Sequence, residues 1–261
     1  MLKESLPLKK NARIKPVTLR VEGLRKRFGK KWAVKDIGFS MHSGEVVGLL
    51  GPNGAGKTTV FYMIVGFIKA TSGQIYLNDE NITRQPMYRR ALEGISYLPQ
   101  EPSVFRKLTV ENNIWAILET RKDLTYSQKR ERLEELLEEF KISSIRKQMA
   151  YPLSGGERRR TEIARNLAID PKFLLLDEPF AGIDPIAVSE IKQLVRELSR
   201  RGVGILITDH NVQHTLAITD RSYIIHLGEI LTHGNRNEIL SNPVAREIYL
   251  GHDFEMPEPV N

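Results

Sequence analysis

The sequence predicts an α/β fold with a mainly parallel sheet, and three observations lead to this prediction. Residues 45–50 (EVVGLL) form a short apolar run typical of a buried strand. A glycine-rich stretch follows directly, and residues 59–68 then carry apolar side chains at helical spacing without a proline. Residues 173–176 (FLLL) are entirely apolar, as in a parallel strand that is covered on both faces.

The glycine-rich stretch matches the phosphate-binding pattern G-x-x-x-x-G-K-[ST] at every fixed position. Glycines let backbone N–H groups converge on a phosphate, and the helix that follows adds partial positive charge. Lys57 would reach the β- and γ-phosphates, the Thr58 hydroxyl would ligate Mg²⁺, and Thr59 would bond a nearer phosphate. The alternative is a glycine-rich turn with no ligand. The predicted loop consists of Gly51, Pro52, Asn53, Gly54, Ala55, Gly56, Lys57, Thr58 and Thr59.

Length and composition limit the classes of protein that fit. A chain of 261 residues with 41% apolar residues suits one large domain, or a domain with a subdomain. The net charge of +7 suits nucleic acid or an anionic membrane surface as a partner, and a solvated lysine-rich surface needs neither. The absence of cysteine excludes disulfides and thiol chemistry. No apolar run approaches the roughly 18 residues of a membrane span, and we see no apolar signal core near the N-terminus.

The N-terminal part of the sequence predicts a tail and a hairpin. Residues 1–16 hold five cations against one acid, so we expect a disordered basic tail there. Residues 17–28 and 32–41 predict two antiparallel strands that turn near Gly29. Phe28 stands beside this turn, where its ring could stack on an adenine base; a place in the core is the alternative.

The middle of the chain predicts two strands and then an inserted helical unit. Residues 73–77 and 95–98 read as short strands, and the second of them ends in Pro99-Gln100. Gln100 would then lie at a strand terminus, with a surface-loop role as the alternative. Beyond it the sequence becomes helical and charged, with amphipathic stretches at 109–118 and 126–140. We place the inserted helical subdomain at about 101–158.

A second anion site is predicted where the next helix begins. Ser154 and Glu157 have the spacing of a capping box, which explains both residues structurally. It does not explain Gly155 and Gly156, which leave unshielded N–H groups at the positive end of a helix that runs to about Ile169.

Two carboxylates follow the apolar strand at 173–176. Burying carboxylates at the end of such a strand costs free energy, so a purely structural role does not explain them. Asp177 fits a Mg²⁺ ligand, direct or indirect, and Glu178 fits a base that orients and deprotonates water. The next buried strand, at 203–207, leads to His210, which we expect near the same edge of the sheet as Glu178.

The rest of the chain gives weaker signals. Asp184 and Pro185 have the types preferred at a helix N-cap and first helical position. Residues 222–227 and 229–232 predict a hairpin around Gly228, and a short helix follows near Asn237. The last residues, 252–261, read as a tail rich in proline and acid.

In order and spacing, these motifs resemble the ATP-binding-cassette (ABC) family over about residues 17–251. The resemblance implies a RecA-like P-loop core with an antiparallel β subdomain and an inserted α-helical subdomain. It also implies a Mg²⁺-dependent ATP hydrolase. Two copies of such a chain sandwich two ATP molecules, each between one P-loop and the signature at 153–157 of the other copy.

The same resemblance implies roles by matched position. Phe28 would stack on adenine, although the family commonly has Tyr there. Gln100 would sense both Mg²⁺ and the attacking water, Glu178 would be the base, and His210 would contact the γ-phosphate. Asp184 would lie in the loop that links the two ATP sites.

For the signature, Ser154, Gly155 and Gly156 would face the γ-phosphate in the site of the opposite copy. Glu157 departs from the usual Gln of the family, but the capping box accounts for its side chain.

Residues around the motifs look most similar to the ATPase subunits of lipopolysaccharide exporters. Those subunits are homodimers on the cytoplasmic face of the inner membrane, bound beneath two membrane subunits, and they touch neither the transported lipid nor nucleic acid. We expect docking of the membrane subunits near Phe105 and Arg106, which follow Gln100. The matching residues are 97–101 (YLPQE), 154–160 (SGGERRR), 177–182 (DEPFAG), 208–211 (TDHN), 249–251 (YLG) and Phe254.

Two other readings stay open. ATPases of branched-chain amino acid importers share the Ser-Gly-Gly-Glu signature and a similar tail, although they typically lack a counterpart of Phe180. A soluble ABC ATPase of translation or DNA repair would normally have two cassettes or a long coiled-coil insert, and neither is present here.

Overall fold

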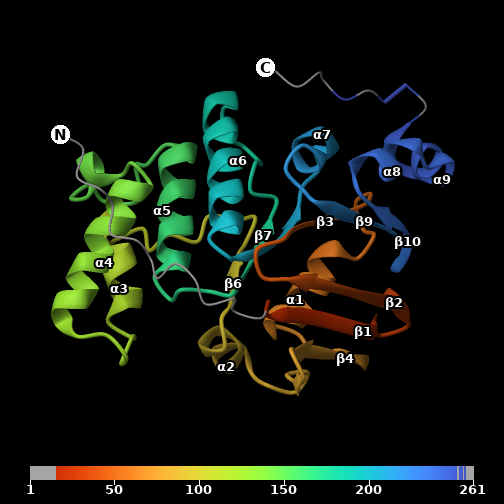
Figure 1. Ribbon diagram of the computed structural model, residues 1–261, viewed down its shortest axis with the longest axis horizontal. Coiled ribbons are helices and arrows are strands. Elements are labelled where there is room, and N and C mark those ends of the chain that lie inside the picture. The colour runs from red at the N-terminus through yellow and green to blue at the C-terminus, as the bar shows by residue number, and fades with distance from the viewer. Residues whose placement is uncertain (1–15, 252, 255, 257–261) are drawn as a thin grey trace.

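The computed structural model describes residues 16–251, 253, 254 and 256. A mixed sheet forms one end of the molecule and a group of helices forms the other (Figure 1). The basic tail predicted at 1–16 lies outside the described residues except for Pro16, and so does most of the tail predicted at 252–261.

The described strands form one sheet in the order β5-β4-β1-β2-β10-β9-β3-β8-β7-β6. Its strands are β1 (Thr18–Phe28), β2 (Lys31–His42), β3 (Val46–Leu50), β4 (Ser72–Leu77), β5 (Glu80–Asn81), β6 (Ile95–Leu98), β7 (Phe173–Asp177), β8 (Gly204–Thr208), β9 (Arg221–His226) and β10 (Glu229–Gly234).

Helices cover the sheet and extend beyond it. They are α1 (Lys57–Val65), α2 (Met87–Leu92), α3 (Val110–Leu118), α4 (Tyr126–Glu139), α5 (Gly155–Leu167), α6 (Pro185–Arg200), α7 (Val212–Leu216), α8 (Arg236–Ser241) and α9 (Pro243–Ala245). A 3₁₀ turn (Ser143–Ile145) and a π-helical turn (Arg246–Leu250) complete the set in the described part of the chain.

The parallel strands β9, β3, β8, β7 and β6 are the core of the fold, as predicted from the apolar run at 173–176. Side chains alternate between the two faces of this sheet. Leu175 and Leu206 belong to the apolar cluster around α1, whereas Leu174 and Ile205 belong to the cluster around α5 and α6. Because these strands are parallel, β3, β7 and β8 all end at one edge of the sheet, where ligands bind in such folds.

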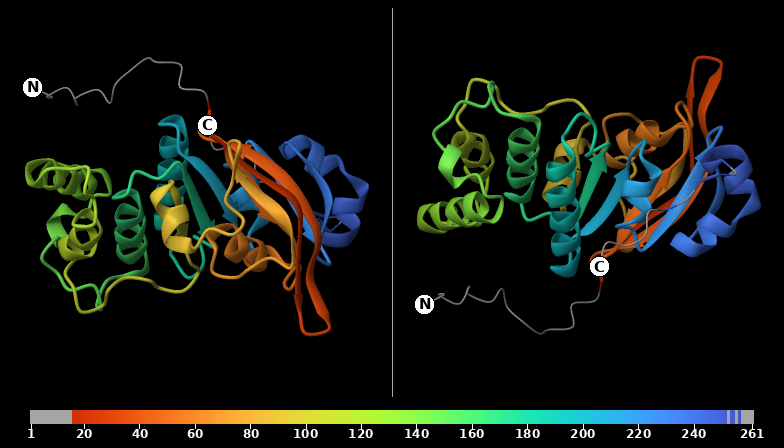
Figure 2. Two further views of the ribbon diagram at one scale, coloured as in Figure 1. Left: turned by 90° about the horizontal axis from the view of Figure 1, so that it is seen from below. Right: turned by 90° about the horizontal axis from the view of Figure 1, so that it is seen from above.

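An antiparallel unit lies beside this core, also as predicted. Strand β1 pairs with β2 and with β4, and the tip of the β1–β2 hairpin projects beyond the rest of the molecule (Figure 2). A single residue pair, Glu229 with Asp36, joins β10 of the core to β2. Apolar side chains of α1, of the antiparallel unit and of the core also belong to one buried cluster, which connects the two parts.

Helices α3, α4 and α5 pack together at the far end from the β1–β2 hairpin (Figures 1 and 2). The face of α4 predicted to be apolar is buried there, through Leu133, Leu136, Leu137 and the capping residue Phe140. The boundaries of a helical subdomain at about 101–158 stay a prediction.

Helix starts follow the capping chemistry in the sequence, with one difference. Ser154 and Glu157 form the expected capping box on α5, and Asp184 accepts a hydrogen bond from the Ala187 N–H at the start of α6. Helix α1 begins at Lys57, two residues before the predicted range. The left-handed turn at Gly56, with φ of 110°, ends the loop earlier than apolar spacing suggested.

Candidate nucleotide-binding and catalytic site

The loop between β3 and α1 requires glycine at two positions, Gly51 and Gly56, where a side chain would collide with neighbouring backbone. Gly51 has φ of 150°, and a Cβ atom there would collide with the Ile225 carbonyl oxygen. At Gly56 a Cβ atom would come within 2.7 Å of the Ala33 carbonyl oxygen. A Cβ atom at Gly54 would meet nothing within 4 Å, so this part of the loop borders open space. The loop therefore presents bare backbone to an open volume, as a phosphate cradle requires.

Lys57, the first residue of α1, turns its ammonium group back toward the loop. The Nζ atom donates to the carbonyl oxygens of Gly51 at 2.7 Å and Pro52 at 3.1 Å. Burial lowers the pKa of Lys57, while the carboxylates of Glu178, Asp177 and Asp209 work to raise it. The cation therefore lies within the field of the acidic strand ends, close to where a phosphate would enter.

A cavity of about 340 Å³ joins this loop to the β1–β2 hairpin and to Glu178. Phe28 lines it with 52% of its surface exposed, so the core alternative for Phe28 is wrong. The ammonium group of Lys26 lies 5.0 Å from the centre of the Phe28 ring. Lys31 pairs with Phe28 across the hairpin turn and also lines the cavity. Lys31 was not predicted as a site residue from the sequence, and its pairing with Phe28 was the signal that could have identified it.

Asp177 is the last residue of β7, and only one of its two carboxylate oxygens accepts a hydrogen bond. Its Oδ2 accepts a hydrogen bond from the Tyr97 hydroxyl at 3.2 Å, whereas Oδ1 is buried and has no hydrogen-bond partner among the described residues. Burial raises the pKa of Asp177, and the nearby Tyr97 and Thr58 hydroxyls partly oppose this shift.

A buried, anionic, unpaired oxygen beside a threonine hydroxyl fits a hard cation such as Mg²⁺. No group of three or more His, Asp or Glu side chains within the described chain could hold a metal alone. A Mg²⁺ ion here would therefore take its other ligands from phosphates and water, which is its usual mode of binding.

Glu178 follows Asp177 in a strained backbone conformation, with φ of 48°. Its N–H donates to the Thr208 carbonyl oxygen at 2.8 Å, which fixes the turn against β8. Burial raises the pKa of the Glu178 carboxyl, as do the charges of Asp177 and Asp209, whereas His210 and Lys57 work to lower it. A carboxyl with a raised pKa accepts a proton more readily, which suits a base.

His210 lies beside Glu178, as predicted from the two strand ends. Its Nε2 is 2.5 Å from Glu178 Oε2, and its side chain is 52% exposed while that of Glu178 is 8% exposed. The imidazole therefore covers the solvent side of the carboxylate.

A second cavity, of about 210 Å³, brings Gln100 together with Glu178 and Gly155. Two of the predicted catalytic side chains thus open onto one space. Ser154 and Gly156 line neither this cavity nor the one at the loop. Gly156 instead packs against α6, where an added Cβ atom would lie 2.9 Å from the Ala187 Cβ.

Sequence reasoning missed a buried ion pair that ties these motifs together. The Arg159 guanidinium donates to the carbonyl oxygens of Pro99 at 2.9 Å and Asp177 at 3.3 Å, and to Glu162 at 3.2 Å. Glu162 in turn accepts from the N–H groups of Ser103 and Val104. Two opposite charges at i and i+3 in a helix were the available signal.

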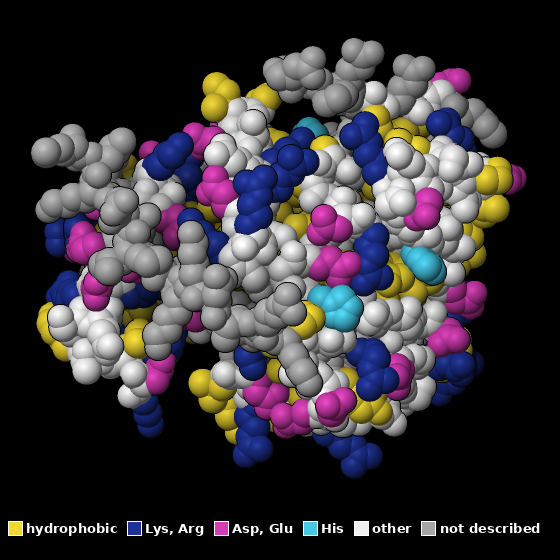
Figure 3. All heavy atoms as spheres, viewed as in Figure 1, with side chains coloured by type: hydrophobic (Ala, Val, Ile, Leu, Met, Phe, Trp, Pro, Cys, Tyr) yellow, Lys and Arg dark blue, Asp and Glu magenta, His cyan; other side chains and the backbone are white. Residues whose placement is uncertain are grey.

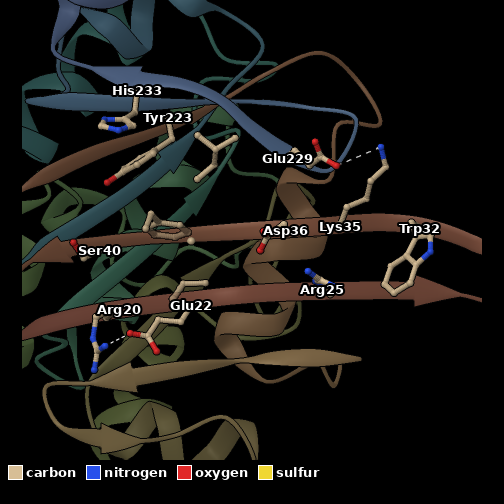
Figure 4. A pocket seen from close by; sticks show the side chains of 14 residues that line it. Arg20, Glu22, Arg25, Trp32, Lys35, Asp36, Ser40, Tyr223, Glu229 and His233 are labelled. Atoms are coloured by element: carbon tan, nitrogen blue, oxygen red, sulfur yellow. Dashed lines mark hydrogen bonds and ion pairs between the residues drawn. The ribbon is translucent and has the colours of Figure 1, made fainter.

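A hollow of about 1080 Å³ lies elsewhere, along β1, β2, β9 and β10 (Figure 4). Its charged groups are partly paired with one another, as in Arg20 with Glu22 and Lys35 with Glu229. Cations and acids also alternate over the face shown in Figure 3. The hollow contains none of the predicted site residues.

The fold and the site define a class before any comparison. A parallel sheet carries a glycine loop ahead of α1, and a carboxylate pair stands at the end of β7; together they make a P-loop nucleotide hydrolase. A model of the family described as ABC transporter matches residues 34–181, more than half of the chain. The chain belongs to the ABC transporter family, and it is an ATP-binding ATP hydrolase of that family.

Individual relatives agree with this assignment. The chain is 52% identical over 238 residues to the lipopolysaccharide export system ATP-binding protein LptB of Haemophilus influenzae, covering 91% of this chain and 99% of the relative. It is 55% identical to an uncharacterized ABC transporter ATP-binding protein of Rhizobium meliloti, covering 92% and 88% of the two chains. A solved ADP-bound cassette of an ABC transporter, 31% identical, superposes with a TM-score of 0.80 over 90% of this chain and 99% of that one.

No helix in the described part of the chain has the length and apolar character needed to cross a membrane.

Proposed function

We propose that this chain is the motor subunit of a transporter that extracts lipopolysaccharide from the inner membrane for export to the outer membrane. The observation that supports this most is the 52% identity to a relative named for lipopolysaccharide export, over 99% of that relative's length. In this proposal the chain works as a homodimer on the cytoplasmic face of the membrane. It binds two integral membrane subunits and does not touch the lipid.

Within the site, we propose that Lys57 and the loop hold the ATP phosphates while Phe28 stacks on adenine. Thr58, Asp177 and Gln100 would hold Mg²⁺, which when bound neutralises charge on the phosphate oxygens. Glu178 takes the proton of the attacking water, because its carboxyl is shielded from solvent and has a raised pKa.

His210 holds Glu178 from the solvent side and meets the γ-phosphate from there. Ser154, Gly155 and Gly156 act on the γ-phosphate bound by the other copy, and Asp184 lies in the loop between the two sites. The start of α5 is compatible with this role, because none of Ser154, Gly155 and Gly156 lines the cavity that we assign to the ATP of the same chain.

Phe105 and Arg106 are the proposed contact with the membrane subunits. The Phe105 ring is 46% exposed, so it is not buried in the core of the helical subdomain. Its backbone is fixed on both sides by Asn113, which accepts from the N–H at 2.7 Å and donates to the carbonyl oxygen at 3.2 Å. The Arg165 guanidinium lies 4.8 Å from the ring centre. An exposed aromatic ring on a fixed backbone has the properties of an interface anchor.

We also propose the chain division given above, with a cassette at 17–251, a helical subdomain at about 101–158, and tails at 1–16 and 252–261. Segment 99–105 then links the helical subdomain to the site, because Arg159 and Glu162 hold its backbone.

Co-purification from membranes in a mild detergent tests the proposed function. We expect two membrane proteins with six spans and large periplasmic domains to be recovered with the tagged chain. Vesicles that contain the complex should then release lipopolysaccharide when ATP is added. Recovery of the membrane subunits of a small-solute importer instead would overturn the lipid assignment and leave the ATPase assignment intact.

A further inference from the structure

Tyr97 contacts the site, although no role there was predicted for it from the sequence. It lies in β6, where the register places it beside Leu175 of β7, two residues before Asp177. From there its hydroxyl reaches along the strand and donates to Asp177 Oδ2 at 3.2 Å. The two residues are far apart in sequence, and the strand pairing alone brings them together.

Three aromatic rings fix the direction of the Tyr97 side chain. The centres of Phe61, Tyr62 and Phe67 lie 6.3, 6.0 and 5.7 Å from its own, and all three rings meet it edge to face. Edge-to-face pairs favour one orientation in addition to the area that they bury. The hydroxyl of Tyr97 is therefore aimed at Asp177 by packing.

Helix α1 provides a further link in this arrangement. Tyr62 follows Thr58 by one helical turn, so both side chains project from the same face of α1. Thr58 interacts with the Asp177 carboxyl, and Tyr62 interacts with the Tyr97 hydroxyl. The Thr58 and Tyr97 hydroxyls thus interact with the Asp177 carboxylate, and Tyr62 supports the second of them.

We propose that Tyr97 is a positioning residue for Mg²⁺ in the ATP site: by holding Asp177 Oδ2, it leaves the buried, unpaired Oδ1 as the oxygen that meets the cation. Without this bond the carboxylate could rotate about its last torsion and exchange its two oxygens. Partners that orient a metal ligand in this way typically change metal affinity by about 10- to 100-fold. The inference rests on the proposed Mg²⁺ site and is independent of the transported lipid.

The test compares Tyr97→Phe with the parent protein in binding measurements that need no turnover. The dissociation constant of a non-hydrolysable ATP analogue is measured once with Mg²⁺ and once with EDTA. The constant in EDTA divided by the constant in Mg²⁺ gives the gain in affinity due to the cation. We expect Tyr97→Phe to lower this gain about tenfold and to leave the constant in EDTA near the parent value. Tyr223→Phe is the matched control, because it removes the hydroxyl of a buried tyrosine bonded to Arg221 in β9, which β3 and β8 separate from the strand of Asp177.

The possible results distinguish failure of the positioning role of Tyr97 from failure of the proposed Mg²⁺ site. An unchanged gain in folded Tyr97→Phe overturns the positioning role, as does equal weakening with and without Mg²⁺. No gain in the parent protein would instead refute the Mg²⁺ site itself. If Tyr97→Phe does not fold, Tyr62→Phe is measured in its place. A decrease in the Mg²⁺-dependent gain, smaller than the tenfold decrease expected for Tyr97→Phe, supports the positioning role of Tyr97, and an unchanged gain overturns it.

Discussion

Glu178 combines three features that ordinary surface carboxylates lack: a left-handed backbone, near-complete burial and a histidine on its open side. Strain of this kind costs about 1–3 kcal/mol and persists where the surrounding structure enforces it. Here the bond to Thr208 and the two flanking strand ends do so. The geometry thus holds one carboxylate in the lining of the cavity proposed for ATP.

Glu178→Gln keeps the shape of this side chain and removes its ability to take a proton. ATP should still bind, and turnover should fall by ~10²–10⁴, as expected for loss of a general base. Steady-state ATPase assays and nucleotide-binding titrations measure the two effects. Glu80→Gln, at an exposed position in β5, is the control and should behave like the parent. Near-normal hydrolysis by Glu178→Gln would exclude Glu178 as the base.

For single residues, the sequence was sufficient to predict the position of those that directly follow a predicted strand or lead into a predicted helix. Lys57, Asp177 and Glu178 stand at the ends of elements, so their position along the chain predicted where they would lie. The role of Tyr97 could not be predicted in this way, because its partner Asp177 belongs to another strand. Only the register of β6 against β7 shows that the Tyr97 hydroxyl reaches Asp177. For Arg159, only the pairing with Glu162 three residues on was visible in the sequence, and the bonds to the Pro99 and Asp177 carbonyl oxygens were not.

Among the helices and strands, α3 is held at its first turn by ion pairs with the segment that precedes α5. Glu111 accepts hydrogen bonds from Arg146 and Lys147, and the backbone of α3 pairs with the same segment. Burial works to raise the pKa of Glu111, but the bonds from Lys147 and Arg146 outweigh it and lower the pKa below its usual value of 4.5. This carboxylate therefore contributes stability above about pH 4.5, which is lost as the pH falls through its lowered pKa.

Glu111→Gln should remove this contribution. We expect the variant to be less stable at pH 7 by about 0.5–1.5 kcal/mol, the usual net contribution of a hydrogen bond, because Gln can replace only part of the pairing with the solvent-accessible Arg146 and Lys147. Its unfolding free energy should also fall less steeply than that of the parent below pH 4.5. Denaturant unfolding at several pH values measures both effects. Glu138→Gln, at an exposed position on α4, is the control, and equal pH dependence in all three proteins would contradict the prediction.

The loop before α3 carries the proposed contact with the membrane subunits. Phe105→Ala should weaken capture of those subunits roughly 30- to 1,000-fold, which corresponds to ~2–4 kcal/mol at an interface anchor. The melting temperature should stay near that of the parent, because the ring is largely exposed. Tyr126→Ala removes an exposed ring from α4 and is the control. A large drop in melting temperature with unchanged capture would place the docking surface elsewhere.

Element prediction succeeded where apolar side chains face inward, and α2 shows why it failed elsewhere. Tyr88 and Leu92 of this helix are 60% and 83% exposed, whereas Arg90 is buried. The Arg90 guanidinium donates to the carbonyl oxygens of Met63 and Ile64 at the end of α1. The pattern is thus inverted, with a cation inside and apolar groups outside, and apolar spacing cannot reveal such a helix.

In the whole molecule, the signature residues lie outside the cavity proposed for ATP. That cavity is lined by the loop, by Phe28 and by Glu178, but not by Ser154. We therefore expect activity to return when two inactive variants are mixed. A pair of one Lys57→Ala chain and one Ser154→Arg chain would have one site with both lesions and one with neither.

ATPase rate against mixing ratio measures this rescue, and each variant alone provides the baseline. A gain on mixing requires sites shared between two copies. Gel filtration of Glu178→Gln with ATP gives an independent check, because tightly bound nucleotide should hold two copies together. A monomer with ATP bound would contradict the shared site.

The sheet order also has a consequence for the time at which the site can form during synthesis. Strand β3, which leads into the phosphate loop, pairs with β8 and β9, and Val47 lies opposite both Leu206 and Arg221. A ribosome must therefore add more than 150 residues beyond Val47 before either neighbour exists. Such non-local pairing slows folding and leaves strand edges open in the meantime. The emerging chain thus exposes an apolar, unpaired strand for most of its translation, and chaperones that shield such strands have their main opportunity before β8 and β9 emerge.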